Sequence, residues 1–114
     1  MNPDPHRGEV WYANLDPTRG REQAGERPVL ILSVDTFNHG PADLVVAIPI
    51  TTTARGILSH TRMDPPNGGL KRTSFVMCEA VRCISKERLR RLCGTVDSRI
   101  MLEVEYAVRT ILGL

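Results

Sequence analysis

Two apolar runs decide the fold of this chain: Pro28-Val29-Leu30-Ile31-Leu32-Ser33-Val34 and Leu44-Val45-Val46-Ala47-Ile48-Pro49-Ile50. Both are short, uncharged and rich in β-branched residues, which is typical of strands buried on both faces. Pro49 has no N–H to donate to a neighbouring strand, so we expect it at an edge or a bulge of the sheet. The two runs predict a β-rich fold with a buried centre.

Further short strands are predicted around this centre. They are expected over residues 9–15, 59–64, 74–84 and 91–96, separated by turn-forming stretches at 16–20 and 65–69. Ser85 precedes one predicted helical turn over residues 86–89. We therefore expect five or more mostly antiparallel strands.

The hydrophobic period changes from Asp97 onward. Apolar residues then recur at helical spacing: Ile100, Met101, Val104, Ala107, Val108, Ile111 and Leu112. Asp97 or Ser98 is expected to cap this amphipathic helix, and Gly113 stands where a helix often ends. The simplest place for the apolar stripe is against the sheet, with part of it available to a partner subunit as an alternative.

Length and composition indicate one ordinary domain over residues 1–114. At 114 residues, with 41% hydrophobic and 25% charged, the chain fits neither a disordered tail nor a membrane protein. The N-terminus predicts no secretory signal peptide, so a cytoplasmic protein is expected. The cysteines Cys78, Cys83 and Cys93 lack metal-ligand spacing and are expected to be reduced core thiols, and no metal site or cofactor is predicted.

Charge is unevenly distributed along the chain. Thirteen of the 15 basic residues are arginine, and residues 54–93 hold nine basic against three acidic residues, a local charge of +6. Arginine binds phosphate in a bidentate way and stacks on bases, so this basic middle segment is compatible with nucleic-acid binding. Genomic base composition is an equally simple source of an arginine-rich sequence.

Several enzyme classes are excluded by missing motifs. The sequence contains no GxGxxG, P-loop, HExxH or GxSxG motif. The polar stretch over residues 16–28 instead stands out because it leads directly into a buried strand, and strand-anchored loops often carry binding groups. Arg27 is held extended by Pro28, and Thr51 ends the second apolar run. If the two strands are neighbours, Arg27 and Thr51 meet.

An ordered series of motifs runs through the N-terminal part of the chain. It reads Arg7-Gly8-Glu9-Val10-Trp11, Leu15-Asp16-Pro17-Thr18-Arg19-Gly20, Glu22-Gln23-Ala24-Gly25 and Arg27-Pro28-Val29-Leu30, and continues at Ile50-Thr51, Ser74-Phe75-Val76, Glu79, Arg82 and the C-terminal Leu112-Gly113-Leu114. Together these motifs resemble the MazF/PemK toxin family over nearly the whole chain. The resemblance implies a mainly β (α+β), CcdB-like, SH3-related small β-barrel with a C-terminal α-helix, assembled as a homodimer.

The resemblance also implies an activity. Such a protein is the toxin of a type II toxin–antitoxin system, a ribosome-independent and metal-independent endoribonuclease. It cleaves single-stranded RNA at a short sequence, leaves 2′,3′-cyclic phosphate and 5′-hydroxyl ends, and is held inactive by a cognate antitoxin. An acidic, partly disordered antitoxin segment is expected to cover the basic surface.

The resemblance assigns Arg27 and Thr51 to catalysis, with Glu22 as an acidic position tied to activity. An arginine is better suited to clamp phosphoryl oxygens than to act as a base, so either Glu22 or His60 is left as the candidate base. RNA contacts are expected from the loops on either side: Thr18, Arg19, Gln23, Thr52, Thr53, Arg55, His60 and Arg82. Aromatic residues are few, which favours arginine stacking and hydrogen bonds over aromatic platforms.

Two other readings remain open. A CcdB-like gyrase poison shares the expected fold, but by resemblance relies on a tryptophan near the C-terminus, whereas the only tryptophan here is Trp11. A catalytically inert SH3-like module that binds nucleic acid or an acidic peptide is the second. That module predicts that Arg27→Ala leaves activity in cells unchanged.

Overall fold

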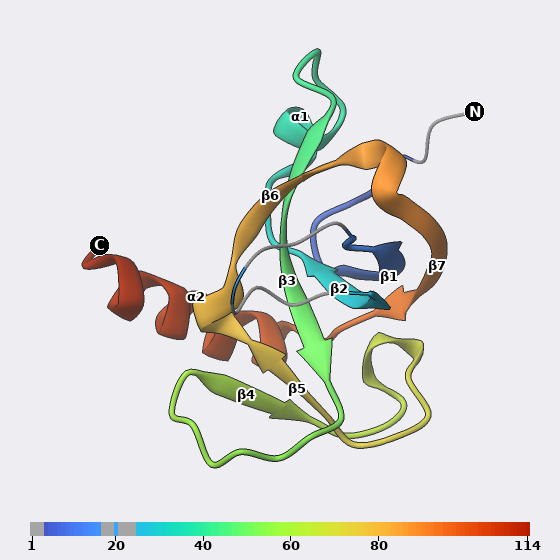
Figure 1. Cartoon of the computed structure of the whole chain (residues 1–114). Coiled ribbons are helices and arrows are strands. Elements are labelled where there is room, and N and C mark those ends of the chain that lie inside the picture. Colours follow the sequence, from blue (N-terminus) through green and yellow to red (C-terminus); the bar gives the residue numbers. More distant parts are fainter. Residues whose placement is uncertain (1–3, 17–19, 21–24) are drawn as a thin grey trace.

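The structure is a computed structural model of the chain, and it describes residues 4–16, 20 and 25–114. Seven strands form one antiparallel sheet in the order β4-β5-β3-β2-β1-β7, with β6 also paired to β3 (Figure 1). The strands are β1 (Glu9–Asn14), β2 (Glu26–Ile31), β3 (Leu44–Thr51), β4 (His60–Met63), β5 (Ser74–Met77), β6 (Arg82–Ser85) and β7 (Leu89–Thr95). The expectation of five or more mostly antiparallel strands is confirmed.

The central strand is β3, which contains the second apolar run. One of its edges pairs with β2, and the other pairs first with β6 over residues 44–47 and then with β5 at Ile50 and Thr51. Pro49 lies opposite Val29 of β2, at the point where the other edge changes from β6 to β5. Pro49 is therefore inside a central strand, at an interruption of one ladder, which is where a missing N–H is tolerated.

The prediction of a single strand over residues 74–84 is wrong. This stretch is divided into β5 and β6 by the short 3-10 turn η2 (Cys78–Ala80). Both halves pair with β3, so the apolar pattern runs through the break and does not reveal it. The predicted helical turn after Ser85 is present as η3 (Lys86–Arg88), and a further 3-10 turn, η1 (Asn67–Gly69), precedes β5.

The sheet is open. Its two end strands are β4 and β7, and within residues 4–16, 20 and 25–114 no ladder joins them. The barrel of the sequence-based expectation is thus a curved, unclosed sheet with a C-terminal helix. A short helix, α1 (Asp35–Asn38), connects β2 to β3 and was not expected, because four residues are too few for a helical period to show.

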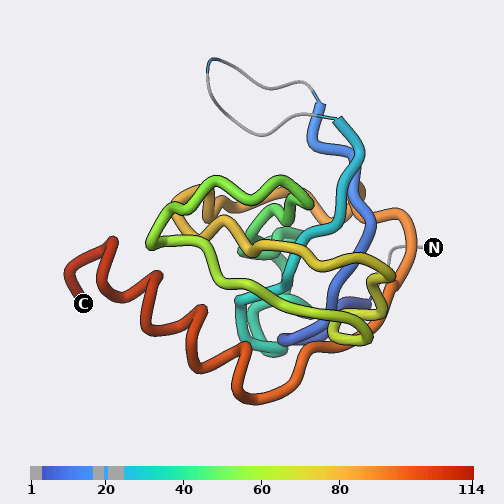
Figure 2. The backbone as a smooth tube through the Cα atoms, turned by 90° about the horizontal axis from the view of Figure 1, so that it is seen from below, coloured from blue at the N-terminus to red at the C-terminus, as the bar shows by residue number. Residues whose placement is uncertain are grey.

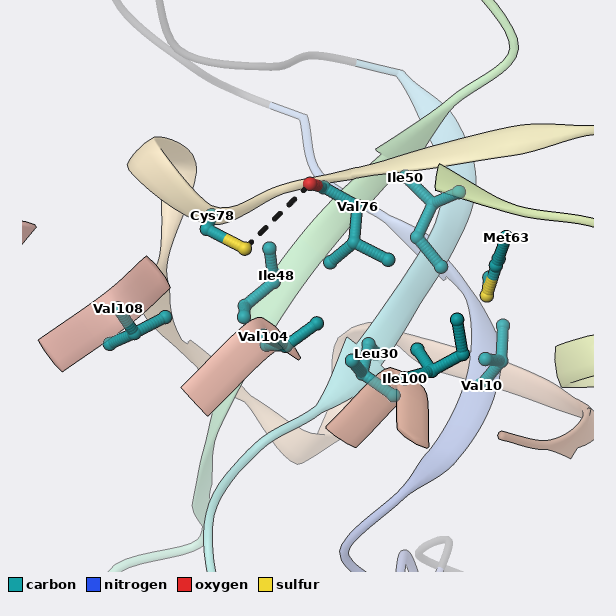
Figure 3. Packing of buried hydrophobic residues seen from close by; sticks show 10 residues of the cluster. All are labelled: Val10, Leu30, Ile48, Ile50, Met63, Val76, Cys78, Ile100, Val104 and Val108. Atoms are coloured by element: carbon teal, nitrogen blue, oxygen red, sulfur yellow. Dashed lines mark hydrogen bonds between the residues drawn. The ribbon is translucent and has the colours of Figure 1, made fainter. Parts of the chain in front are cut away.

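Two apolar clusters fill the two sides of the sheet. The first lies under the C-terminal helix α2 (Ser98–Leu112), which contributes Ile100, Val104 and Val108 and packs on Leu30 and Ile48 (Figure 3). Figure 2 shows α2 running along one side of the strands. The second cluster is formed by Ala13, Leu15, Val29, Ile31, Val45, Ala47, Ile84 and Leu89.

The helix begins as the sequence predicts. The Asp97 carboxylate accepts a hydrogen bond of 2.9 Å from the backbone N–H of Ile100 and caps the first turn. The predicted apolar stripe packs on the sheet, but its last members, Ile111 and Leu112, remain exposed. Across the part of the chain that the structure describes, no helix is long and apolar enough to cross a membrane.

The three cysteines occupy different environments. All are free thiols, but only Cys78 is buried; Cys93 is half-buried and Cys83 is exposed. The expectation of core thiols is therefore correct for Cys78 and wrong for Cys83, whose strand β6 presents it to solvent.

Candidate functional site

Arg27 and Thr51 stand near the same end of two paired strands, β2 and β3. The paired residues are Val29 with Pro49, Leu30 with Ile48 and Ile31 with Ala47. The ladder ends two residues before Arg27 and Thr51. Side chains two residues apart on a strand point to the same face, so Arg27 shares the face of Val29 and Ile31, and Thr51 shares the face of Ala47. Both are half-buried, at the edge where the second apolar cluster ends.

A pocket of about 180 Å³ opens beside Thr51. Its lining is largely apolar and includes two basic residues, Lys71 and Arg72. The residues that line it are Pro28, Ile50, Thr51, Thr52, Leu70, Lys71, Arg72 and Ser74. Positive charge beside a small apolar cavity suits a ligand that has both an anionic and a flat apolar part, such as a nucleotide.

Lys71 and Arg72 were not predicted as site residues. They precede β5, in the stretch that crosses from η1 to the strand beside Thr51. The available signal was their place in the basic middle segment immediately before Ser74. Sequence alone does not say that this stretch folds back beside the end of β3.

The hydroxyl of Thr51 has a fixed position. Its Oγ1 accepts a hydrogen bond of 3.2 Å from the backbone N–H of Thr53, which forms a local turn at the end of β3. Because this bond uses a lone pair, the hydroxyl proton stays available to donate. Thr52, Thr53 and Arg55 follow on an exposed loop, and their contact with RNA stays a prediction.

His60 lies elsewhere. Only 3% of its side chain is exposed, and Nε2 is 2.8 Å from Oε2 of Glu79. Ser59 donates a hydrogen bond of 2.7 Å to the other carboxylate oxygen. His60 therefore holds Glu79, and an RNA contact at this position stays a prediction.

Glu79 is stabilised as a carboxylate by these contacts. Burial acts to raise its pKa, but the hydrogen bonds from Ser59 and His60 outweigh burial and hold the pKa of Glu79 below its ordinary value. Nδ1 of His60 is buried and, among the described residues, has no hydrogen-bond partner. A ring held by one nitrogen and buried at the other is a poor candidate for a base that must reach a ribose hydroxyl.

Arg82 is also set apart from Thr51. It begins β6 and pairs with Ala47, whereas Thr51 pairs with Phe75 of β5. Ala47 and Thr51 are four residues apart on β3, a separation of about 13 Å along the strand. Arg82 therefore lies along the same edge of the central strand β3 as β5, but farther along that edge from the pocket.

The remaining predicted residues are Glu22, Thr18, Arg19 and Gln23, and all four lie outside the described residues. The two ends of their connection are well fixed. The Leu15 N–H donates to the Gly25 carbonyl at 3.0 Å, and the Arg88 guanidinium donates to the Asp16 carbonyl at 2.6 Å. These bonds anchor the β1–β2 connection directly beside Arg27.

One group of side chains has the composition of a metal site. Asp4, His6 and His39 each offer a ligand atom, and these atoms lie within 4.8 Å of one another. The group is near α1, at the opposite end of β3 from Thr51 (Figure 1). It is separate from the pocket beside Thr51.

Known proteins resemble the chain over its whole length. Residues 6–112 match the family described as PemK-like, MazF-like toxin of type II toxin–antitoxin system. Endoribonuclease EndoA of Bacillus subtilis (strain 168) is 34% identical over 109 residues, which cover 95% of this chain and 94% of that protein.

Solved structures give the same result. MazF from Deinococcus radiodurans superposes with a TM-score of 0.88 at 25% identity, over 99% of this chain and all of that one. An endoribonuclease of a mycobacterial species, solved in complex with its cognate antitoxin, superposes with a TM-score of 0.78 at 30% identity, over 96% of each chain. The chain belongs to the PemK-like, MazF-like toxin family of type II toxin–antitoxin systems.

Proposed function

We propose that this toxin is a ribosome-independent endoribonuclease that cleaves single-stranded RNA at a short sequence and needs no metal ion. The observation that carries the proposal is that Arg27 and Thr51 stand near the same end of paired strands, with a pocket lined by Thr51, Lys71 and Arg72 beside them. The proposal is supported by relatives of this chain that are named endoribonucleases. We place the activity in the cytoplasm, where its RNA substrate is found and where thiols stay reduced.

The reaction is an in-line displacement at phosphorus. The ribose 2′-oxygen forms a bond to phosphorus, the bond to the 5′-oxygen breaks, and the products are a 2′,3′-cyclic phosphate and a 5′-hydroxyl. One proton leaves the 2′-oxygen and one is delivered to the departing 5′-oxygen. Because a guanidinium stays protonated at neutral pH, Arg27 serves to clamp the phosphoryl oxygens rather than to remove the first proton.

Thr51 supplies a hydroxyl beside that clamp. Its bond from the Thr53 N–H holds the oxygen in place, so its proton can be directed to a phosphoryl oxygen as charge develops there. For the proton on the 2′-oxygen, the burial of His60 leaves Glu22 as the preferred base. Bases of the RNA would occupy the pocket and the exposed Thr52–Arg55 loop, with Lys71 and Arg72 on flanking phosphates.

The test is cleavage of a long single-stranded RNA by purified protein with EDTA present. We expect cuts at one short sequence, 3′ ends that must be dephosphorylated before ligation, and 5′ ends that a kinase labels directly. Arg27→Ala and Thr51→Ala are each expected to lower the rate by at least about 100-fold. Arg109→Ala and Thr95→Ala, at exposed positions on α2 and at the end of β7, are matched controls that keep the wild-type rate.

Other results would overturn the proposal. RNA that stays intact at every protein concentration favours a gyrase poison or an inert binding module. Cleavage that persists in both Arg27→Ala and Thr51→Ala would place the active site elsewhere.

The toxin is also proposed to be inhibited by a cognate antitoxin with an acidic, partly disordered segment. Support comes from the mycobacterial neighbour in complex with its antitoxin and from the +6 charge of residues 54–93. The segment is expected to cover Arg27, Arg55 and Arg82. Hydrogen exchange at these positions that does not slow on antitoxin binding would contradict this.

A homodimer is proposed as the functional unit. An open groove of about 420 Å³ lies between β4 and α2, and Leu58, Leu102 and Tyr106 are exposed along it. A second copy of the chain would cover these apolar side chains. Sedimentation at micromolar concentration is expected to give twice the chain mass, and a monomer mass would count against the proposal.

A further inference from the structure

The two histidines that the function does not use lie next to each other. The ring centroids of His6 and His39 are 4.8 Å apart in an edge-to-face arrangement. Nε2 of His39 is 3.1 Å from Oδ1 of Asp4, and Asp4, His6 and His39 each place one ligand atom within 4.8 Å of the other two. Residues far apart in sequence are therefore gathered into a cluster of two imidazoles and a carboxylate.

A fourth residue orients one of these imidazoles. Asp35, the first residue of α1, has Oδ2 3.0 Å from Nδ1 of His6, and its Oδ1 accepts a 2.8 Å hydrogen bond from the backbone N–H of Arg7. With Nδ1 held by a carboxylate, Nε2 of His6 is the nitrogen left to bind a ligand. A carboxylate on the second nitrogen of a metal-binding histidine is a recurrent feature of zinc sites.

We propose that Asp4, His6 and His39 bind one divalent transition-metal ion of the Zn²⁺ type. The ligands are Nε2 of both histidines and a carboxylate oxygen of Asp4, with water at the fourth position. Imidazole and carboxylate ligands together suit Zn²⁺, Ni²⁺ or Cu²⁺, whereas Mg²⁺ requires an octahedral set of oxygens.

Metal binding requires the ligand atoms to move closer together. Metal–ligand bonds of about 2.0–2.1 Å in a tetrahedron place ligand atoms about 3.3 Å apart. The Asp4–His39 pair is already at 3.1 Å, and exposed side chains can close the remaining gap to His6 by rotation. His39 must exchange its 2.7 Å contact with the Pro5 carbonyl for the metal ion, with its proton moved to Nδ1.

The electrostatic surroundings favour a cation. Asp4, Glu9 and Asp35 carry negative charge around His6. The guanidinium of the adjacent Arg7 is bonded to the Leu32 carbonyl and to Glu105. Acidic side chains therefore outnumber basic ones around the cluster, which favours a bound cation.

The role of such a site is structural. Asp4 and His6 belong to the segment before β1, whereas Asp35 and His39 flank or begin α1, so the ion links the N-terminal segment to α1. The site is at the opposite end of β3 from Thr51, and metal there leaves RNA cleavage metal-independent. The sequence predicted no metal site, because residues 4, 6 and 39 follow no metal-ligand spacing.

The first experiment is calorimetric titration of tag-free, full-length protein, stripped with EDTA and dialysed, with ZnCl₂. We expect saturable binding of one ion per chain and no binding of MgCl₂. His6→Ala and His39→Ala are expected to weaken zinc binding at least tenfold, and Asp35→Asn about tenfold. Cys83→Ser, which removes an exposed thiol, is the control that keeps wild-type affinity.

A measurement on the wild-type chain removes any dependence on how the variants fold. In NMR spectra of the histidine side chains, zinc is expected to shift the ring signals of His6 and His39 and to leave those of His60 unchanged. Absence of saturable binding, equal affinity in both histidine variants, or shifts confined to His60 would each overturn the proposal.

Discussion

Nε2 of His60 lies 2.8 Å from Oε2 of Glu79, and this contact ties the first residue of β4 to the turn η2 that separates β5 from β6. Ser59 donates a hydrogen bond to the other carboxylate oxygen of Glu79. Two contacts with Glu79 therefore hold the end of the 52–59 loop in place. Because Thr52, Thr53 and Arg55 lie on this loop, the Glu79 carboxylate positions residues proposed to contact RNA.

Glu79→Gln is expected to lower stability in a pH-dependent way. The pKa of Glu79 is lower in the folded protein than its ordinary value. The Glu79 carboxylate therefore contributes to the free energy of unfolding above the unfolded-state pKa, and this contribution is lost as pH falls through the folded-state pKa. At pH 7 we expect a loss of at most about 1 kcal/mol, since 42% of the side chain is exposed and screened. Urea unfolding of wild type and variant is expected to differ at pH 7 and to converge once the pH falls below the folded-state pKa of Glu79.

Glu87→Gln is the matched control for this measurement. Glu87 is an exposed carboxylate on η3, and its replacement is expected to leave the pH dependence unchanged. If Glu79→Gln and Glu87→Gln behave alike, the Glu79 contacts do not stabilise the fold.

Lys71→Ala is expected to weaken RNA binding without impairing the chemical step. Lys71 lines the pocket beside Thr51, but its flexible side chain is suited to a flanking phosphate rather than to the reacting one. We expect KM to rise about threefold to tenfold with kcat within about a factor of two, and the salt dependence of binding to fall by about one unit of slope. Titration of RNA at several salt concentrations measures this.

Arg90→Ala controls for the loss of one positive charge at an exposed position on β7, outside that pocket. It is expected to change KM and the salt slope less than Lys71→Ala does. Equal effects of the two substitutions would mean that Lys71 acts only through overall charge.

Strand pairing explains how much of the site could be predicted. The position of Arg27 before Pro28, and of Thr51 at the end of an apolar run, indicates that both stand at strand ends. That they stand near the same end of the sheet then depends on β2 and β3 being neighbours, as they are. The strand-rich fold, the helix over Ser98–Leu112 and the strand-end positions of Arg27 and Thr51 follow from such local patterns.

Features that depend on long-range packing could not be found in this way. The break between β5 and β6 does not alter the apolar pattern, and the burial of His60 results from β4 lying against η2. The approach of Lys71 to Thr51 likewise requires the chain to turn back after η1. Asp4, His6 and His39 meet only because α1 packs beside the segment before β1.

Gly69→Ala is expected to destabilise the fold strongly. A Cβ atom at this position would lie 1.9 Å from the carbonyl oxygen of Cys93, and the backbone φ of +70° is unfavourable for any other residue. Because the obstacle is the backbone of β7, it cannot rotate away, and we expect a loss of about 3 kcal/mol or more. Thermal unfolding followed by circular dichroism measures the change.

Gly56→Ala separates the steric effect from the conformational one. Its φ of +63° is similar, but a Cβ atom there would meet nothing within 4 Å. We expect Gly56→Ala to lower the free energy of unfolding by about 1 kcal/mol, from backbone strain alone. A loss at Gly69 no larger than the loss at Gly56 would show that η1 moves away from β7 without cost.

Cys78 and Cys83 are expected to differ in reactivity toward alkylating agents. Cys78 is buried in the cluster under α2, where its Sγ is 3.8 Å from the Val76 carbonyl (Figure 3). Burial raises the pKa of Cys78 to about 11, so at pH 8 only about one molecule in a thousand carries the reactive thiolate there. Cys83 is exposed on β6 and is expected to react at the rate of an ordinary surface thiol.

Iodoacetamide labelling followed by peptide mass spectrometry measures both sites in one sample. We expect Cys83 to be modified within minutes and Cys78 only after urea unfolds the chain, when both rates become equal. Since access to Cys78 requires the packing of Val104 and Val108 to open, its labelling rate at moderate urea reports the stability of α2 on the sheet. Comparable labelling of Cys78 and Cys83 in the native protein would contradict the packing of the first apolar cluster.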